Sequence, residues 1–381
     1  MIPMFDLQSN TFMLAGPVKM HPRVLNAMAS PAINHRSPDF QKVVGDIRGL
    51  LQYVFQTKND TCLFSGSGTA AIEAAISNTV KRGDKFVSIS NGKFSERLYK
   101  VAKIFCQDGA NEFKVPWGQA PDLAQLEDMV RKIKPKALAV CHNETSTAVT
   151  VQAKEIAKIA HDNGAYFIMD GVTSIGSINV PVDEWGCDIA FFGSQKCVAG
   201  PAGLSAMAIS ENIKPALYKD TSYYLNVLKH IEKMKKNDTP YTPAIPLFLG
   251  MREALLMTKE EGLEARFKRI ESIANGLRAA VDAMGLTLFA DRKYASNTVT
   301  AINLPAGVDD DKFRKMMKND YNTIVASAQE PFKGKFFRIG HMGNVSWADM
   351  MPTIAATEVC MKKLGHKFEL GAGAAAAEKF M

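Results

Sequence analysis

The sequence predicts an α/β protein with a large, mainly parallel sheet, followed by a smaller α+β domain. Between about residues 60 and 210, short apolar runs rich in β-branched and aromatic residues alternate with segments of helical periodicity. The apolar runs lack the polar alternation of half-exposed strands, which indicates a sheet covered by helices on both faces. At 381 residues, the chain exceeds the roughly 250 to 300 residues at which a single core stops growing, so we expect a second domain.

The large domain is expected to contain six strands joined by helices. Each predicted strand is a short apolar run, and the runs cover residues 61–65, 85–90, 137–142, 165–170, 188–194 and 204–210. Apolar residues recur every three or four positions in the segments between them, which predicts helices over 69–80, 95–105, 123–133 and 153–164. Strand and helix therefore alternate as in sheets built from parallel β-α-β units.

The last third of the chain predicts the smaller α+β domain. A long helical stretch over 251–284 leads into it. Further strands are expected at 286–289, 297–305, 323–329 and 336–340, with helices at 309–321 and 346–365. We place the boundary near residue 255. Residues 1–14 are expected to pack with the small domain, 15–255 to form the large domain, 256–366 the small domain, and 367–381, rich in alanine and glycine, a flexible tail.

The composition argues against several classes of protein. The net charge is +7, but basic and acidic residues are interleaved, and the densest basic run, 229–237, lacks the aromatic residues of a nucleic-acid binder. No apolar run approaches the ~18 to 20 residues of a membrane helix. The six cysteines form no CxxC pair, so we expect reduced thiols, no metal site and a cytoplasmic location.

Three strand ends carry residues suited to binding or catalysis, and ligands of an open α/β sheet lie beyond the carboxyl ends of its strands. The loop SGSGT, residues 65–69, joins a strand to a helix and is compatible with a tight turn, a phosphate site or a dinucleotide site. Asp170 is either a cap or ion-pair partner within the protein, or the partner of a cationic ring nitrogen. Lys196 either extends into solvent or serves as a reactive amine.

Together these three features favour one cofactor. Pyridoxal phosphate needs a phosphate cradle, a partner for its pyridinium nitrogen and a lysine that forms a Schiff base. The loop 65–69, Asp170 and Lys196 provide one of each, at strand ends of the same predicted sheet. The sequence therefore predicts a pyridoxal-phosphate site.

Longer motifs carry a family resemblance over nearly the whole chain. They include LAGPVKMHPRV, SGSGTAAIEAA, SNGKFSERL, HNETSTAV, MDGVTSIG, GSQK, YTPAIP and FRIGHMG. The chain resembles the class V aminotransferases of the fold-type I pyridoxal-phosphate enzymes, and within them the alanine:glyoxylate and serine:pyruvate aminotransferases. The resemblance implies a seven-stranded, mainly parallel sheet in the large domain, a smaller α+β C-terminal domain, and a homodimer with shared active sites.

The resemblance also implies a role for each matching residue. Lys196 would form the Schiff base and shuttle the α-proton, and Asp170 would keep the pyridinium nitrogen protonated. Arg338 would bind the substrate α-carboxylate; the alternative interpretation is that it forms a surface salt bridge. Other cofactor contacts would come from residues that hold the phosphate, stack on the ring, lie near its hydroxyl or reach over from the second subunit: Ser67, Gly68, Thr69 and Gln195; Phe94 and Val172; Ser146; Tyr241 and Thr242.

At three positions the chain departs from the family pattern. Thr69 replaces the histidine of close relatives, Phe94 replaces a frequent tryptophan, and Ala244 replaces a frequent threonine. A threonine hydroxyl can still donate a hydrogen bond to phosphate.

The reaction implied is the transfer of an amino group from a small amino acid, alanine or serine, to a 2-oxo acid, glyoxylate or pyruvate, in two half-reactions. An aspartate or phosphoserine aminotransferase would need a second cationic anchor, for which Lys19, His35 and Arg36 are candidates.

Two further alternatives share the fold. A cysteine desulfurase-like enzyme is disfavoured, because Gln195 and Phe94 stand where those enzymes have histidine. A catalytically silent subunit that binds the cofactor is disfavoured because the Schiff-base lysine, the ring-nitrogen acid and the carboxylate-binding arginine are all retained.

Overall fold

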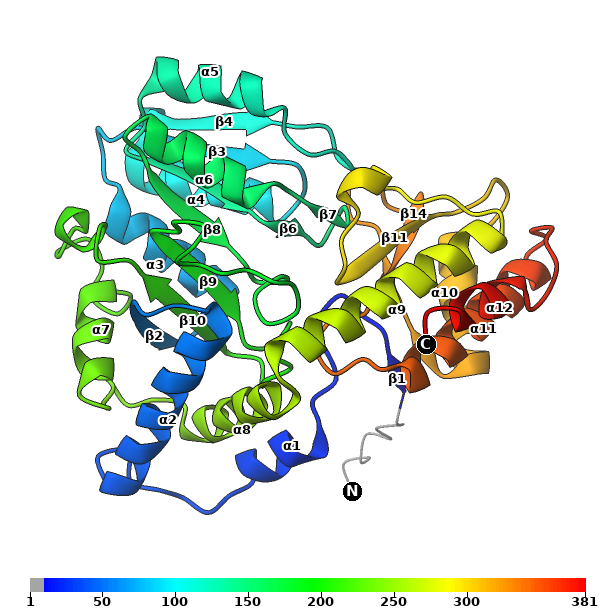
Figure 1. Ribbon diagram of the computed structural model, residues 1–381, viewed down its shortest axis with the longest axis horizontal. Helices are drawn as coiled ribbons and strands as arrows, with labels where there is room; N and C mark the ends of the chain where they lie inside the picture. Colours follow the sequence, from blue (N-terminus) through cyan, green and yellow to red (C-terminus); the bar gives the residue numbers. More distant parts are fainter. Residues whose placement is uncertain (1–9) are drawn as a thin grey trace, which may run out of the picture.

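The computed structural model describes residues 10–381, and its largest element is a seven-stranded sheet (Figure 1). The strand order is β2-β10-β9-β8-β5-β3-β4. Neighbours run parallel except at β10, which is antiparallel to both β2 and β9. The strands are β2 (Asp60–Ser65), β3 (Phe86–Ser90), β4 (Ala110–Lys114), β5 (Ala137–Cys141), β8 (Tyr166–Asp170), β9 (Ile189–Gly193) and β10 (Leu204–Ile209). The seven-stranded, mainly parallel sheet is thus confirmed.

The edge strand β4 is the member of this sheet that the six predicted strands omit. It pairs with β3, with Ala110 opposite Phe86 and Lys114 opposite Ser90. Its sequence, ANEFK, is largely polar, and none of its residues is fully buried. Such an edge strand lacks the apolar run by which the central strands were recognised, and its charged side chains discourage pairing with a second chain.

Helices cover both faces of the large sheet. Successive side chains of a strand point to opposite sides, so each strand contributes to a hydrophobic core on either face. Leu138 and Val140 of β5 share one hydrophobic core with helices α2 (Pro38–Phe55), α5 (Leu123–Ile133), α6 (Ala153–Asp162) and α8 (Ile245–Glu261). Ala137 and Ala139 share the opposite core with α3 (Gly68–Thr79), α4 (Ser95–Cys106) and α7 (Val227–Lys235). Helix α1 (Pro22–Met28) packs on α8.

The C-terminal part of the chain is a smaller α+β region with its own core, which includes Ile273, Phe313 and Phe337. Its antiparallel sheet has the order β11-β14-β13, and a separate strand pair joins β1 near the N-terminus to β12 in parallel. The bounds are β1 (Thr11–Phe12), β11 (Val299–Asn303), β12 (Thr323–Ile324), β13 (Ala326–Ser327), β14 (Phe336–Gly340), α9 (Leu263–Ala283), α10 (Asp310–Tyr321), α11 (Trp347–Lys363) and α12 (Ala372–Glu378). A short hairpin, β6 (Asn143–Glu144) with β7 (Val149–Thr150), completes the strands.

Three expectations for this region are corrected. The helical stretch over 251–284 is two helices, since the chain breaks at Gly262, whose φ of +81° is left-handed. Residues 286–289 form no strand, and only Leu288 makes an isolated bridge, to Ile302. The tail, expected to be flexible, forms α12, which packs against α9 with Ala377 buried (Figure 1). Its alanine-rich sequence is a strong helix former once such a docking site exists. The domain boundary near residue 255 stays a prediction.

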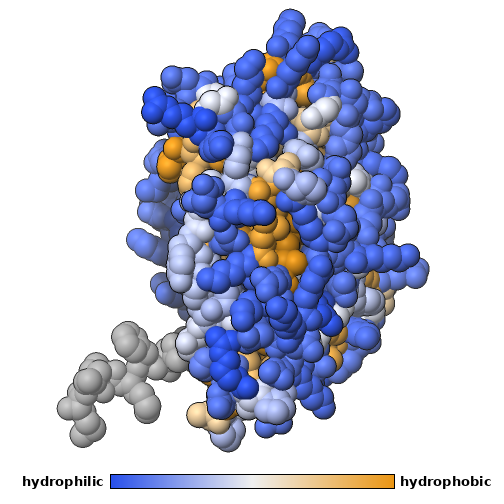
Figure 2. Space-filling view, turned by 90° about the vertical axis from the view of Figure 1, so that its left-hand side faces the viewer, coloured by the Kyte–Doolittle hydropathy of each residue, from blue (hydrophilic) through white to orange (hydrophobic). Residues whose placement is uncertain are grey.

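The face of the molecule in Figure 2 is mainly hydrophilic, with a band of hydrophobic side chains near its centre. Within residues 10–381, no helix is both long and apolar enough to cross a membrane. The predicted packing of residues 1–14 against the small domain falls partly outside the described residues, of which β1 is the first element.

Candidate active site

One cavity lies at the carboxyl ends of β2, β5, β8 and β9. Eight of the sequence-predicted residues line it: Ser67, Gly68, Thr69, Phe94, Asp170, Val172, Gln195 and Lys196. These strands all run in the same direction, so the residues that follow them meet at one edge of the sheet. Six lining residues had not been predicted: Ile72, Arg97, Cys141, Asn143, Thr145 and Thr173.

The Lys196 amine lies under the N-terminal segment of the chain. Its Nζ donates a hydrogen bond to the carbonyl oxygen of Ala15 at 2.6 Å. Gly16 makes this approach possible, because its φ is +96° and a Cβ there would lie 2.2 Å from the Lys196 Cδ. Burial, reinforced by the positive charges of Arg338 and Arg97, lowers the pKa of Lys196 to about 8. The amine is therefore held in place, and it loses its proton at a lower pH than an ordinary lysine does.

This lowered pKa predicts the pH dependence of cofactor uptake. At pH 7 about one Lys196 amine in ten would be neutral, against about one in 3,000 at the ordinary lysine pKa of 10.5. Only the neutral amine attacks a carbonyl, so the rate of pyridoxal-phosphate attachment should rise about tenfold per pH unit below pH 8 and level off above it. Stopped-flow absorbance of protein freed of cofactor measures this rate. Free N-acetyl-lysine is the control, and a protein rate that keeps climbing to pH 10 would contradict the prediction.

Asp170 ends β8 as a buried carboxyl group that forms no ion pair among residues 10–381, although the charges of Arg97 and Lys196 act on it. Its Oδ1 accepts a hydrogen bond from the Val172 backbone N–H at 2.9 Å. Burial raises the pKa of Asp170 to about 7. A cationic ring nitrogen placed against this carboxylate would supply the missing charge and return the aspartate to its ionised form.

The loop between β2 and α3 has the geometry of an anion site. Ser67 is the N-cap of α3, yet its hydroxyl makes no capping hydrogen bond, and the helix begins at Gly68. The first N–H groups of the helix and its positive dipole end therefore face the cavity without a side-chain cap. Gln195 also lines the cavity there, and its side-chain amide NH₂ group can donate a hydrogen bond to an anion. A phosphate at this loop, with a ring between Phe94 and Val172, fits the residues present.

Ser146, predicted to lie near the ring hydroxyl, does not line the cavity. Its hydroxyl donates to the Glu144 carboxylate at 2.7 Å and accepts from the Lys93 N–H at 2.9 Å. Glu144 also accepts the N–H groups of Phe94 and Ser95 at 3.1 and 2.7 Å. This buried carboxylate thereby caps α4 and positions the aromatic ring at the cavity.

Arg338 on β14 lies beside the cavity as a buried guanidinium. Its Nε and Nη2 donate to the Ser327 carbonyl at 3.2 and 2.7 Å, and its Nη1 donates to the Thr145 carbonyl at 3.0 Å. Burial lowers its pKa, and no described carboxylate forms an ion pair with it. The surface salt bridge considered from the sequence is therefore absent within residues 10–381, and two of its five N–H groups remain for a ligand.

Tyr241 and Thr242 lie away from the cavity of their own chain. The Tyr241 hydroxyl donates to the Tyr223 carbonyl at 2.6 Å, and its ring stacks on Tyr224 with centroids 5.1 Å apart. Thr242 is exposed. Neither residue lines the cavity that holds Lys196.

None of the three candidate anchors lines this cavity either. Arg36 forms an ion pair with Asp238 and donates to the Thr239 carbonyl at 2.8 Å. Lys19 lines a different cavity, which it shares with Asp349. His35 is partly buried and lies outside the lining of both cavities.

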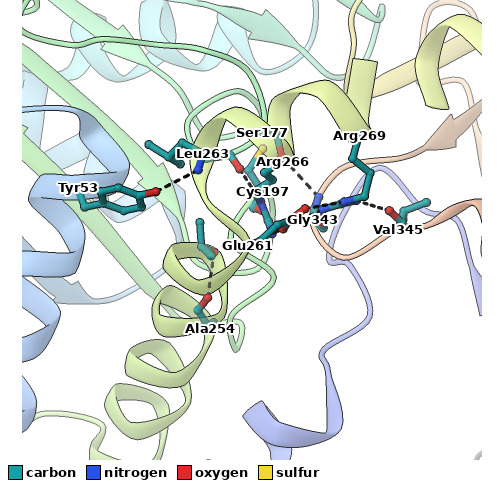
Figure 3. A network of polar contacts seen from close by, with 12 residues as sticks. Tyr53, Ser177, Cys197, Ala254, Glu261, Leu263, Arg266, Arg269, Gly343 and Val345 are labelled. Atoms are coloured by element: carbon teal, nitrogen blue, oxygen red, sulfur yellow. Dashed lines mark hydrogen bonds and ion pairs between the residues drawn. The ribbon is translucent and has the colours of Figure 1, made fainter. Parts of the chain in front are cut away.

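A buried arginine holds the loops on which the site depends (Figure 3). Arg266 of α9 is 1% exposed. Its Nε donates to the Gly176 carbonyl at 2.8 Å and its Nη2 to the Cys197 carbonyl at 2.7 Å. These carbonyls belong to the loops that follow β8 and β9, so one guanidinium ties together the loops next to Asp170 and Lys196.

The same cluster reaches the loop after β14. Arg266 and Arg269 both pair with Glu261, at 2.5 and 2.6 Å. Arg269 also donates to the Gly343 carbonyl at 3.0 Å and to the Val345 carbonyl (Figure 3). The α8–α9 junction thus connects the loop after β14, the strand that carries Arg338, to the Lys196 loop.

Lys196, Asp170 and the N-terminus of α3 together have the chemistry that a phosphorylated carbonyl cofactor requires. Residues 19–329 match the family model for aminotransferase class-V. The chain belongs to the class-V aminotransferases, a pyridoxal-phosphate-dependent family, and is therefore a transaminase. The family resemblance found in the sequence is confirmed.

Several curated relatives match over nearly their full length. An uncharacterized aminotransferase of Methanocaldococcus jannaschii is 41% identical, with 95% of both chains covered. A soluble hydrogenase 42 kDa subunit of Anabaena cylindrica is 38% identical, covering 96% of this chain and 97% of the relative. Serine–glyoxylate aminotransferase of Methylorubrum extorquens and L-aspartate–glyoxylate aminotransferase of Paracoccus denitrificans are each 34% identical, covering 98% and 97% of this chain and 96% of each relative.

The fold is also similar to that of solved enzymes. The crystal structure of ureidoglycine–glyoxylate aminotransferase from Bacillus subtilis superposes with a TM-score of 0.91 at 30% identity, covering 98% of both chains. That of alanine–glyoxylate aminotransferase from Nostoc sp. gives 0.90 at 30% identity, covering 95% of this chain and 97% of that one.

Proposed function

We propose that the protein moves an amino group from a small amino acid, alanine or serine, to a 2-oxo acid, glyoxylate or pyruvate. The observation that carries this proposal is the single cavity in which Lys196, Asp170 and the loop 65–69 meet. Arg338 adjoins the cavity through its bond to the Thr145 carbonyl. The names of several relatives include glyoxylate, which supports it as an acceptor.

Pyridoxal phosphate would be held at its carbonyl carbon, at its ring nitrogen, on the two faces of its ring and at its phosphate. Lys196 would bind its carbonyl carbon, Asp170 would stay paired with its protonated ring nitrogen, and the ring would lie between Phe94 and Val172. The phosphate would take hydrogen bonds from the loop residues and the neighbouring amide: Ser67, Gly68, Thr69 and Gln195. When bound, the cofactor supplies the electron sink that stabilises negative charge at the substrate Cα.

The protein's own groups would handle the proton and the carboxylate. The Lys196 Nζ would take the proton from the substrate Cα, a task that suits an amine with a pKa of about 8. Arg338 would bind the α-carboxylate with the N–H groups it does not spend on backbone carbonyls. The segment at Ala15 and Gly16 covers the amine and limits the access of water.

We expect the complete site to be that of a homodimer, with Tyr241 and Thr242 reaching the phosphate of the second subunit. Thr242 is exposed, and neither residue serves its own cavity, as this arrangement requires. The hydrophobic band in Figure 2 is the kind of surface that a second copy covers. A cytoplasmic location is in keeping with six free, buried cysteines.

A panel of half-reactions tests the proposed substrates. Purified protein loaded with cofactor is mixed with single amino acids, and the change in cofactor absorbance is followed. We expect alanine and serine to convert the spectrum, because the described cavity gives no cation besides Lys196 and Arg97. Conversion by aspartate alone would replace the small-substrate proposal with an aspartate enzyme. No conversion by any amino acid would favour a silent subunit.

A further inference from the structure

Arg97 is a cation of the active-site cavity to which no role has been assigned. It lies on α4, three residues after Phe94, and its guanidinium carbon is 5.3 Å from the centre of the Phe94 ring. Its Nη1 donates a hydrogen bond to the Thr69 Oγ1 at 2.9 Å. The side chain therefore bridges the predicted ring-stacking residue and the predicted phosphate loop.

This guanidinium makes no direct contact with a carboxylate within residues 10–381, although the Asp170 carboxylate in the same cavity interacts with its charge. It forms no ion pair there, and the bond to Thr69 uses one of its five N–H groups. The Glu144 carboxylate nearby is already taken by four donors, the N–H groups of Phe94, Ser95 and Ser146 and the Ser146 hydroxyl. A partly buried charge of this kind calls for a partner, and a ligand anion is the partner that the cavity can admit.

We infer that Arg97 binds the phosphate group of the cofactor, together with Thr69; this rests on the proposed function. Because Arg97 donates to the Thr69 oxygen, the threonine hydroxyl keeps its own proton for a further acceptor. The hydroxyl proton and the unused guanidinium N–H groups both lie beside the uncapped N-terminus of α3. Three kinds of donor thus converge on one anion site, and a guanidinium fork matches phosphate geometry.

The position of Arg97 favours the phosphate over a substrate carboxylate. Its one hydrogen bond within the described chain goes to the loop 65–69, whereas Arg338 is bonded to Thr145 and Ser327. The two arginines therefore serve separate ends of the cavity. With Arg97 engaged by phosphate, the described cavity lacks a second cation for a distal acid group, in keeping with small substrates.

The affinities for pyridoxal phosphate and for pyridoxal, which lacks the phosphate, test this inference. Protein freed of cofactor is titrated with each compound, and bound ligand is measured by equilibrium dialysis. We expect Arg97→Gln to weaken pyridoxal phosphate binding about 10- to 100-fold, the effect of losing hydrogen bonds to a charged group, with pyridoxal binding unchanged. Arg97→Lys, which keeps the charge, should fall between. Lys103→Gln, on the exposed side of the same helix, should bind both compounds like the wild type.

Two results would overturn the inference. Arg97→Gln could weaken both affinities equally, which would mean that Arg97 only shapes the pocket. It could also leave both affinities unchanged, and a raised KM for aspartate would then identify Arg97 as a substrate anchor. The proposed function fails separately if the wild type binds pyridoxal phosphate with the expected dependence on Arg97 and yet converts no amino acid. A wild type that binds no cofactor would overturn both.

Discussion

Replacement of Lys196 by alanine should abolish covalent attachment of pyridoxal phosphate and lower transaminase turnover by at least about 10⁴-fold. That factor is the upper range for losing a positioned general base, and the variant loses the nucleophile as well. No other described amine can take over, because Lys196 is the only lysine that lines the cavity within residues 10–381. A guanidinium group, as in Arg97 and Arg338, does not form a Schiff base with the cofactor.

Borohydride reduction followed by peptide mass spectrometry measures the attachment directly. In the wild type the cofactor should be found on the peptide that contains Lys196. Lys154→Ala, which removes an exposed lysine paired with Glu184, is the matched control and should keep both the label and the activity. A Lys196→Ala protein that still carries reduced cofactor at a single site would show that the Schiff-base lysine lies elsewhere.

Replacement of Arg266 by methionine should destabilise the folded protein by about 3–5 kcal/mol, the range found when one partner of a buried ion pair is removed. Methionine fills much of the same volume but leaves the Gly176 and Cys197 carbonyls without their donors, and Glu261 with one arginine instead of two. Because those carbonyls lie beside the Asp170 and Lys196 loops, cofactor affinity should fall along with stability.

Thermal unfolding of the cofactor-loaded protein measures the effect. A loss of this size corresponds to a fall in Tm of roughly 4–6 °C for a chain of this length. Arg252→Met is the control: it removes an arginine of similar size from the more exposed pair with Asp46, and should cost about 1 kcal/mol or less. Equal shifts in the two variants would show that the buried network adds nothing beyond an ordinary surface pair.

The central part of the fold could be read from the sequence because buried parallel strands leave a clear pattern. Runs such as residues 165–170 and 188–194 are apolar except at their ends, and both became central strands, β8 and β9. Where burial is partial the pattern disappears, as in the polar edge strand β4. The break at Gly262 was missed because helical periodicity continues on both sides of it, and only the backbone angle separates α8 from α9.

The cavity residues that follow strands could be predicted from the sequence in the same way, and others were missed. Lys196, Asp170 and Ser67 were found because each follows a recognisable strand and carries a group with known chemistry. Arg97 was missed because it lies in a helix, where an arginine is ordinarily a solvent-exposed residue. Its spacing of three residues from Phe94, on one face of α4, was the available signal.

The sequence by itself determined six of the seven strands of the large sheet, the residues at the strand ends and the family to which the chain belongs. These depend on local pattern and on which side chains the cofactor chemistry requires. Only the tertiary structure decided that Ala15 covers the Lys196 amine, that the Glu144 carboxylate accepts the first N–H groups of α4, and that Arg97 reaches Thr69. Each of these contacts joins segments far apart in the chain or on different elements, and its existence depends on packing distances that no local pattern encodes.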